Sequence, residues 1–182
     1  MRYPSRLLTD DRKRAFAKRV SVHGGIVVID QSGSMDIDET TLAALLRVAP
    51  NAIVVGYSHR PGDVGRTANA WMLANRGAVA TSFPSGNVGN GVDGPVLRWA
   101  IGERRGSEPI VWVTDGQVTD SHDHPDELLT LECARLVTGA RIRLVRHLDR
   151  AGRALTSGQP TQPSTWAEFG RLGRKMEQNT GR

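Results

Sequence analysis

A short apolar run followed directly by alternating oxygen-bearing side chains is the feature that most constrains how this chain can fold. The run is residues 26–29, within the stretch GGIVVIDQSGSMD, and it is typical of a buried strand. Asp30, Ser32 and Ser34 follow it. Because one carboxylate and two hydroxyls would leave the same strand end together, they predict a site for a hard cation such as Mg²⁺. A plain polar turn is the alternative, since Ser, Gly and Asp are also ordinary turn residues.

Further apolar runs alternate with amphipathic helical patterns. Strands are predicted at 25–29, 52–57, 110–113 and 141–145, with a weaker edge strand at 70–74, and helices at about 40–49, from Pro95 onward and from Pro125 to Gly139. This alternation predicts an α/β fold with a doubly wound, mostly parallel sheet and helices on both faces. Ligand sites in such sheets lie beyond the carboxyl ends of the strands. Asp115, in the sequence VTDG after a later strand, is therefore expected near Asp30.

Length and composition predict one domain with a segment on either side. The 182 residues divide into a basic arm at 1–23, a domain at 24–147, and a linker with a closing helix at 148–182. No run approaches the roughly 18 apolar residues of a membrane helix, so a cytoplasmic location is the expectation. A single cysteine, Cys133, excludes an internal disulfide and any multi-cysteine zinc site. It lies in the apolar pattern of a predicted helix and is expected to be a buried thiol.

The charge pattern is a weaker guide to partners. The formal net charge is +5, which is compatible with an acidic partner such as RNA, although most of the basic residues are scattered arginines. Only Lys13, Lys18 and Lys175 are lysines. A phosphate-binding G-x-x-x-x-G-K-[ST] loop is therefore absent.

Three segments occur in an order that resembles a known family. They are D-Q-S-G-S after the first strand, a Gly- and Asn-rich loop at 82–95 before a helix, and V-T-D-G after a later strand. Together they resemble the von Willebrand factor A (VWA) family, of the intracellular bacterial type, and its metal-ion-dependent adhesion site. The resemblance covers about residues 24–145. It implies that Ser32 and Ser34 bind Mg²⁺ (or Mn²⁺) directly and that Asp30 and Asp115 hold it largely through waters. An Asp or Glu carboxylate from a protein partner would complete the coordination.

The central loop departs from the family pattern. The family usually has a threonine here, in a sequence like G-G-T-x-L, whereas the best match in this chain places Gly91 at that position. Asn90 could supply an amide oxygen instead, and Asp93 a carboxylate. Hydroxyl groups are also available in this part of the chain, on Thr81, Ser82 and Ser85.

The resemblance implies a non-enzymatic, magnesium-dependent protein-binding module, an adaptor in an intracellular complex such as one with a MoxR-type AAA+ ATPase. RNA binding is one alternative, because VWA domains also occur in Ro ribonucleoproteins. A phosphatase of the haloacid dehalogenase type, with Asp30 as its nucleophile, is another. That chemistry usually needs a second acid two residues on, where this chain has Ser32.

The histidine pair in S-H-D-H-P invites a metal-site interpretation. His122 and His124 lie in a polar loop before a predicted helix. Because a histidine zinc site normally needs three or four ligands, we expect a surface turn.

Overall fold

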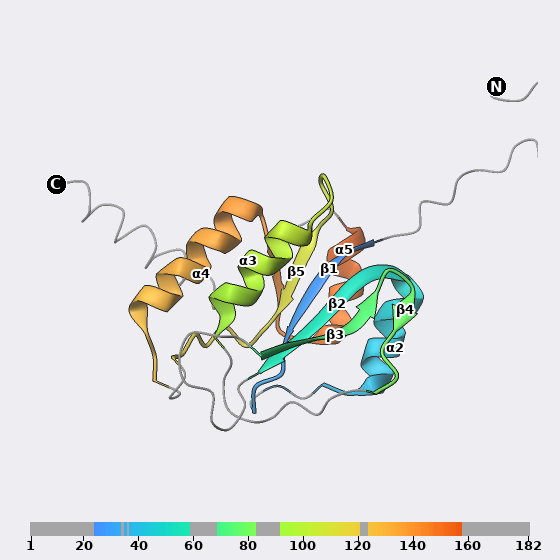
Figure 1. Ribbon diagram of the computed structural model, residues 1–182, viewed down its shortest axis with the longest axis horizontal. Helices are drawn as coiled ribbons and strands as arrows, with labels where there is room; N and C mark the ends of the chain where they lie inside the picture. Colours follow the sequence, from blue (N-terminus) through green and yellow to red (C-terminus); the bar gives the residue numbers. More distant parts are fainter. Residues whose placement is uncertain are drawn as a thin grey trace, which may run out of the picture.

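A computed structural model describes residues 24–33, 35, 37–58, 69–82, 92–120 and 124–157. These residues form a mixed sheet covered by helices (Figure 1). The strands are β1 (Gly24–Asp30), β2 (Asn51–Ser58), β3 (Asn69–Asn75), β4 (Ala78–Val79), β5 (Ile110–Val113) and β6 (Arg143–Val145). The helices are α2 (Glu39–Val48), α3 (Asp93–Glu103), α4 (Glu127–Ala140), the short 3-10 helix η2 (Leu148–Arg150) and α5 (Ala151–Thr156).

The sheet is mostly parallel and has the order β4-β3-β2-β1-β5-β6. Its central strand β1 pairs in parallel with β2 and β5, and β5 pairs in parallel with β6. The pairs β2–β3 and β3–β4 are antiparallel. The predicted α/β class and the mostly parallel sheet are therefore confirmed. The weaker strand predicted at 70–74 is β3, but it is not the edge strand, because the short strand β4 pairs with its outer side.

Successive side chains of β1 point to opposite faces of the sheet, and each face has its own apolar core. On one face Val27 lies in a cluster with Leu45 of α2 and Leu155 of α5. On the other face Val28 lies in a cluster with Leu97 of α3 and with residues of α4. Figure 1 shows α3 and α4 side by side on this second face. Because β1 is buried on both faces, its sequence is a continuous apolar run rather than an alternating one.

Several observed element boundaries differ from the predicted ones, and in part helix capping explains the difference. Asp38 caps α2, and its carboxylate accepts a hydrogen bond from the Thr41 backbone N–H at 2.6 Å. Pro125 was predicted as the first residue of α4, but the helix begins at Glu127 because Asp126 caps it. Helix α3 begins at Asp93, two residues before Pro95. Strand β6 begins at Arg143 because Arg141, with φ 54°, ends α4 in the left-handed conformation.

The segment after β6 is the main correction to the sequence interpretation. A linker was predicted from residue 148, yet η2 and α5 occupy residues 148–156. Leu148, Ala151, Ala154 and Leu155 are buried in the core that also contains Val27. The predicted closing helix around Trp166 and the basic arm at 1–23 lie outside the described residues.

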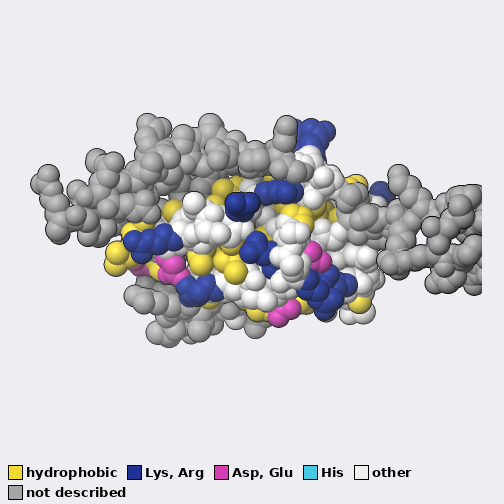
Figure 2. All heavy atoms as spheres, turned by 90° about the horizontal axis from the view of Figure 1, so that it is seen from above, with side chains coloured by type: hydrophobic (Ala, Val, Ile, Leu, Met, Phe, Trp, Pro, Cys, Tyr) yellow, Lys and Arg dark blue, Asp and Glu magenta, His cyan; other side chains and the backbone are white. Residues whose placement is uncertain are grey.

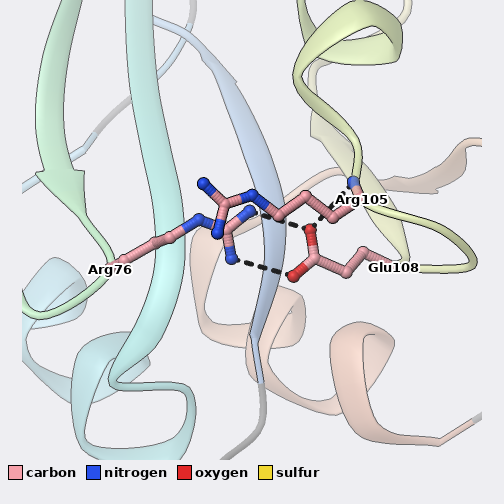
Figure 3. A network of polar contacts seen from close by, with 3 residues as sticks. All are labelled: Arg76, Arg105 and Glu108. Atoms are coloured by element: carbon pink, nitrogen blue, oxygen red, sulfur yellow. Dashed lines mark hydrogen bonds and ion pairs between the residues drawn. The ribbon is translucent and has the colours of Figure 1, made fainter.

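An arginine and a glutamate join the sheet's edge hairpin to the segment before β5. Arg76, in the turn between β3 and β4, donates two hydrogen bonds to Glu108, at 2.9 and 3.0 Å (Figure 3). The Arg105 backbone N–H also donates to Glu108, at 3.2 Å. This contact lies at the amino ends of the parallel strands, opposite the edge at which Asp30 ends β1.

The expectation that Cys133 is buried can be checked directly. Cys133 is 1% exposed and packs between α4 and the sheet, and burial raises the pKa of its thiol, so a buried structural thiol is confirmed. Trp112 is fully buried as well. Among the helices of the described residues, none is both long enough and apolar enough to cross a membrane.

Candidate functional site

The candidate site lies at the carboxyl ends of the central parallel strands. Asp30 is the last residue of β1, and Asp115 follows β5 by two residues. Since β1 and β5 are neighbouring parallel strands, their polar extensions meet at one edge of the sheet. The hydroxyl group of Thr114 connects the two, because it donates to the Asp30 carboxylate at 3.3 Å.

Asp30 is a buried carboxylate with few compensating contacts. Its residue is 4% exposed, and its Oδ1 accepts a hydrogen bond from the Ser32 backbone N–H at 2.9 Å. The pKa of Asp30 is raised from its ordinary value of 3.8 to about 6, mainly by burial and to a smaller extent by the negative charge of Asp115. Hydrogen bonds from Ser32 and Thr114 oppose this rise. Without a countercharge, the ionised form of Asp30 is therefore disfavoured in this protein.

Ser32 lies in a tight turn that is anchored in the core. Its carbonyl oxygen accepts a hydrogen bond from the Met35 backbone N–H at 3.0 Å, and the Met35 side chain packs into the same apolar cluster as Val27. Ser32 is itself only 2% exposed. The turn therefore holds Ser32 beside Asp30, whereas Ser34 lies outside the described residues.

The residue between Asp30 and Ser32 fixes the loop from the opposite face of the sheet. The Oε1 atom of Gln31 accepts a hydrogen bond from Nε1 of Trp71, at 2.8 Å. Gly56 leaves room for this contact, because a Cβ atom there would lie 1.9 Å from the same Gln31 oxygen. Gln31 thus positions the site without facing it.

The VTDG segment forms a second tight turn. The Asp115 carboxylate accepts a hydrogen bond from the Gln117 backbone N–H at 2.9 Å, and the Gly116 N–H donates to the Thr114 hydroxyl at 3.1 Å. Gly116 has φ 85°, a conformation that residues with a Cβ atom rarely adopt. The glycine therefore allows Thr114 and Asp115 to leave β5 at the site.

A second buried carboxylate, which belongs to α3, lies on the face of the sheet to which the Asp30 side chain points. Asp93 is 3% exposed, and its Oδ1 accepts a hydrogen bond from the Tyr57 hydroxyl at 2.5 Å. The Tyr57 oxygen in turn accepts one from Nε1 of Trp112, at 2.9 Å. Burial and then the charge of Asp30 hold the pKa of Asp93 well above its usual range. The other carboxylate oxygen of Asp93, Oδ2, has no hydrogen-bond partner among the described residues.

The chain was compared with known proteins in three ways. No protein-family model matches it. No curated protein and no solved structure matches it either.

The structure brings together only some of the site residues that were predicted from the sequence. The structure brings Asp30, Ser32 and Asp115 to one edge of the sheet. Thr81 and Ser82 are exposed and follow β4, which β3 and β2 separate from β1. The remaining candidates lie outside the described residues, namely Ser34, Ser85, Asn90 and Gly91.

The two histidines were predicted to lie in a surface turn. His124 is exposed, and its backbone N–H donates to the Asp120 carboxylate at 2.9 Å, as expected for such a turn. His122 lies outside the described residues.

The site contains two residues whose roles the sequence analysis missed. In the sequence, Tyr57 and Trp112 look like ordinary strand and core residues, because each stands in an apolar run. Both are fully buried, and each uses its polar atom in the hydrogen-bond chain that ends at Asp93. The only signal in the sequence is that buried Tyr and Trp usually need a partner for their O–H or N–H group.

The acidic side chains of the described residues are not placed so that several of them could bind one metal ion directly. Within the ranges that the structure covers, no three His, Cys, Asp or Glu side chains are grouped so that they could hold a metal ion. A Mg²⁺ ion often keeps several of its waters and is bound by few carboxylates. Direct ligation by hydroxyls, with carboxylates one water away, would not require such a group of acids.

Proposed function

We propose that this chain is a magnesium-dependent protein-binding module with a doubly wound, VWA-like fold. The observation that carries the proposal is the pair of buried carboxylates Asp30 and Asp93, to which Asp115 adds a third negative charge. The groups that most strongly shift the pKa values of Asp30 and Asp93 include no cationic side chain of the described residues. Burying ionised carboxylates without a countercharge is costly. A divalent cation supplies that countercharge.

The donor set fits Mg²⁺, and Mn²⁺ as its substitute. The hydroxyls of Ser32 and Ser34 would bind the ion directly, and Asp30 and Asp115 would hold it through waters. All four donors are oxygens, which hard cations prefer. The Asp30 carboxylate already accepts bonds from Ser32 and Thr114, and these contacts fix its orientation toward the site.

The ligand chemistry indicates what kind of partner the module recognises. Hydroxyl groups donate little electron density and leave the bound cation strongly electrophilic. An Asp or Glu carboxylate of a protein partner can then complete the coordination with a large gain in affinity. We propose that the module works without catalysis, as an adaptor in an intracellular, cytoplasmic complex, and a MoxR-type AAA+ ATPase is a fitting partner.

Calorimetric titration with Mg²⁺ tests the proposal on the wild type and on Ser32→Ala. We expect weak one-site binding by the wild type that tightens when acetate is added as a stand-in for the partner's carboxylate. Ser32→Ala removes one direct ligand, so we expect its Mg²⁺ affinity to fall at least about tenfold.

Ser107→Ala makes the same chemical change at an exposed loop position and serves as the control. We expect it to bind Mg²⁺ like the wild type. Equal affinities for Ser32→Ala and the wild type would show that this serine holds no ion.

RNA binding is the second candidate, and one surface favours it. Figure 2 shows arginine side chains across the face at the amino ends of the parallel strands. Two arginines of the chain stabilise the fold, since Arg104 donates to the Ala140 carbonyl and Arg76 pairs with Glu108. RNA binding would be tight at low salt and would weaken steeply as salt is added. If the chain binds a protein in a way that depends on magnesium but not on the salt concentration, this result would count against RNA binding.

A further inference from the structure

The Asp93 carboxylate, whose buried charge supports the proposed function, also has one oxygen atom to which no described residue donates a hydrogen bond. The carboxylate is buried at the start of α3, with Oδ1 bonded to Tyr57 and Oδ2 without a partner among the described residues. A negative charge in the first turn of a helix gains only a small stabilisation from the helix dipole. Burying an ionised carboxylate costs considerably more than that. Its position on the helix therefore does not account for an acid at this place.

The sheet register places Asp93 next to the Asp30 side chain. Asp30 and Tyr57 are paired residues on the neighbouring parallel strands β1 and β2. Tyr57 and Val28 lie in the same core cluster, and Asp30, two residues after Val28, points to that same face. The Tyr57 hydroxyl, and with it the carboxylate of Asp93, therefore lies on the face of the sheet to which Asp30 points. The negative charge of Asp30 is also one of the causes that raise the pKa of Asp93, which agrees with this placement.

The hydrogen-bond chain from the sheet defines how Asp93 is held. The Trp112 N–H donates to the Tyr57 oxygen, and the Tyr57 O–H donates to Oδ1 of Asp93. All three residues are at most 3% exposed. Oδ1 is thus occupied by a donor from the core, and Oδ2 is left as the oxygen that can accept from something else, such as a water of a hydrated cation.

We infer that Asp93 is a further oxygen donor of the cation site, which holds a water of the ion through Oδ2. This inference rests on the proposed function, because it concerns the same bound ion. Tyr57 is then a positioning residue for Asp93. The completed site contains three carboxylates in the second coordination sphere, from Asp30, Asp93 and Asp115.

Magnesium calorimetry on Asp93→Asn tests the inference. Asparagine keeps an oxygen that can accept from Tyr57 but loses the second carboxylate oxygen and the charge. We expect its Mg²⁺ affinity to fall about 10- to 100-fold. Glu127→Gln is the matched control, because Glu127 is an exposed acid in the first turn of α4, and we expect it to bind Mg²⁺ like the wild type.

The outcomes separate this inference from the proposed function. Wild-type affinity in Asp93→Asn, together with lost binding in Asp30→Asn, would overturn the inference alone. Absence of Mg²⁺ binding by the wild type would overturn both. If Asp93→Asn does not fold, Tyr57→Phe provides the test, since it removes only the hydroxyl that orients Asp93. We expect it to bind Mg²⁺ at least about threefold more weakly, and unchanged affinity would contradict the inference.

Discussion

Asp30→Asn is expected to abolish the response of the protein to Mg²⁺ and, in the presence of a chelator, to make it more stable than the wild type at pH 7. The substitution removes a buried charge that only a bound cation would compensate. Since the pKa of Asp30 is raised from 3.8 to about 6, the gain at pH 7 is on the order of 3 kcal/mol. Chemical unfolding of both proteins in chelator, followed by thermal unfolding with and without Mg²⁺, measures the two effects.

The pH dependence of this difference has a definite sign. The pKa of Asp30 is higher in the folded protein than its ordinary value of 3.8. The folded state therefore holds this proton more tightly, and the resulting stability is full below about pH 4 and is lost as the pH rises through 6. The asparagine side chain of the variant cannot titrate. We expect the advantage of Asp30→Asn over the metal-free wild type to be small near pH 4 and to reach its full size by pH 7.

A control separates this effect from a general change in net charge. Asp149→Asn makes the same substitution at an exposed position after β6. We expect it to leave the unfolding free energy within about 0.5 kcal/mol of the wild type at either pH. If Asp30→Asn is less stable than the wild type in chelator at pH 7, Asp30 is a structural acid and the cation site loses its main support.

Leu155→Ala is expected to cost about 2–4 kcal/mol of unfolding free energy, because it empties a buried site in a well-packed core. Leu155 is 5% exposed and packs at the start of β1, where a Cβ atom on Gly25 would lie 2.7 Å from its Cδ2. Urea unfolding measures the loss. Arg153→Ala, an exposed change on the same short helix, is expected to cost no more than about 0.5 kcal/mol. Equal small costs for both would mean that α5 adds little to the core.

The core strands could be predicted from the sequence because a parallel sheet buried on both faces imposes a plain signal. Runs such as residues 26–29 and 110–113 are short, apolar and rich in β-branched residues. Helix α5 gave no such signal. It has six residues, contains Gly152, and stands in a stretch rich in Gly, Pro, Ser and Thr. Its place in the core depends on contacts with β1 and α2 that local sequence does not encode.

The candidate site was predictable where it depends on strand ends alone. Asp30 and Asp115 each follow an apolar run, and parallel pairing brings such positions to one edge. The role of Asp93 was not predictable, although its carboxylate was one of several candidate donors. Its partner Tyr57 is 36 residues away in the chain, and their hydrogen bond exists only because α3 packs on the face to which Tyr57 points.

Locating the ion tests the central claim most directly. Crystals of the wild type soaked with Mn²⁺ would show it by anomalous scattering. We expect one Mn²⁺ ion bound by the hydroxyls of Ser32 and Ser34 at about 2.1 Å, as for Mg²⁺, with waters between the ion and the carboxylates of Asp30 and Asp115. An ion at another position, or no ordered ion at this edge of the sheet, would contradict the proposal that the chain is a magnesium-dependent binding module.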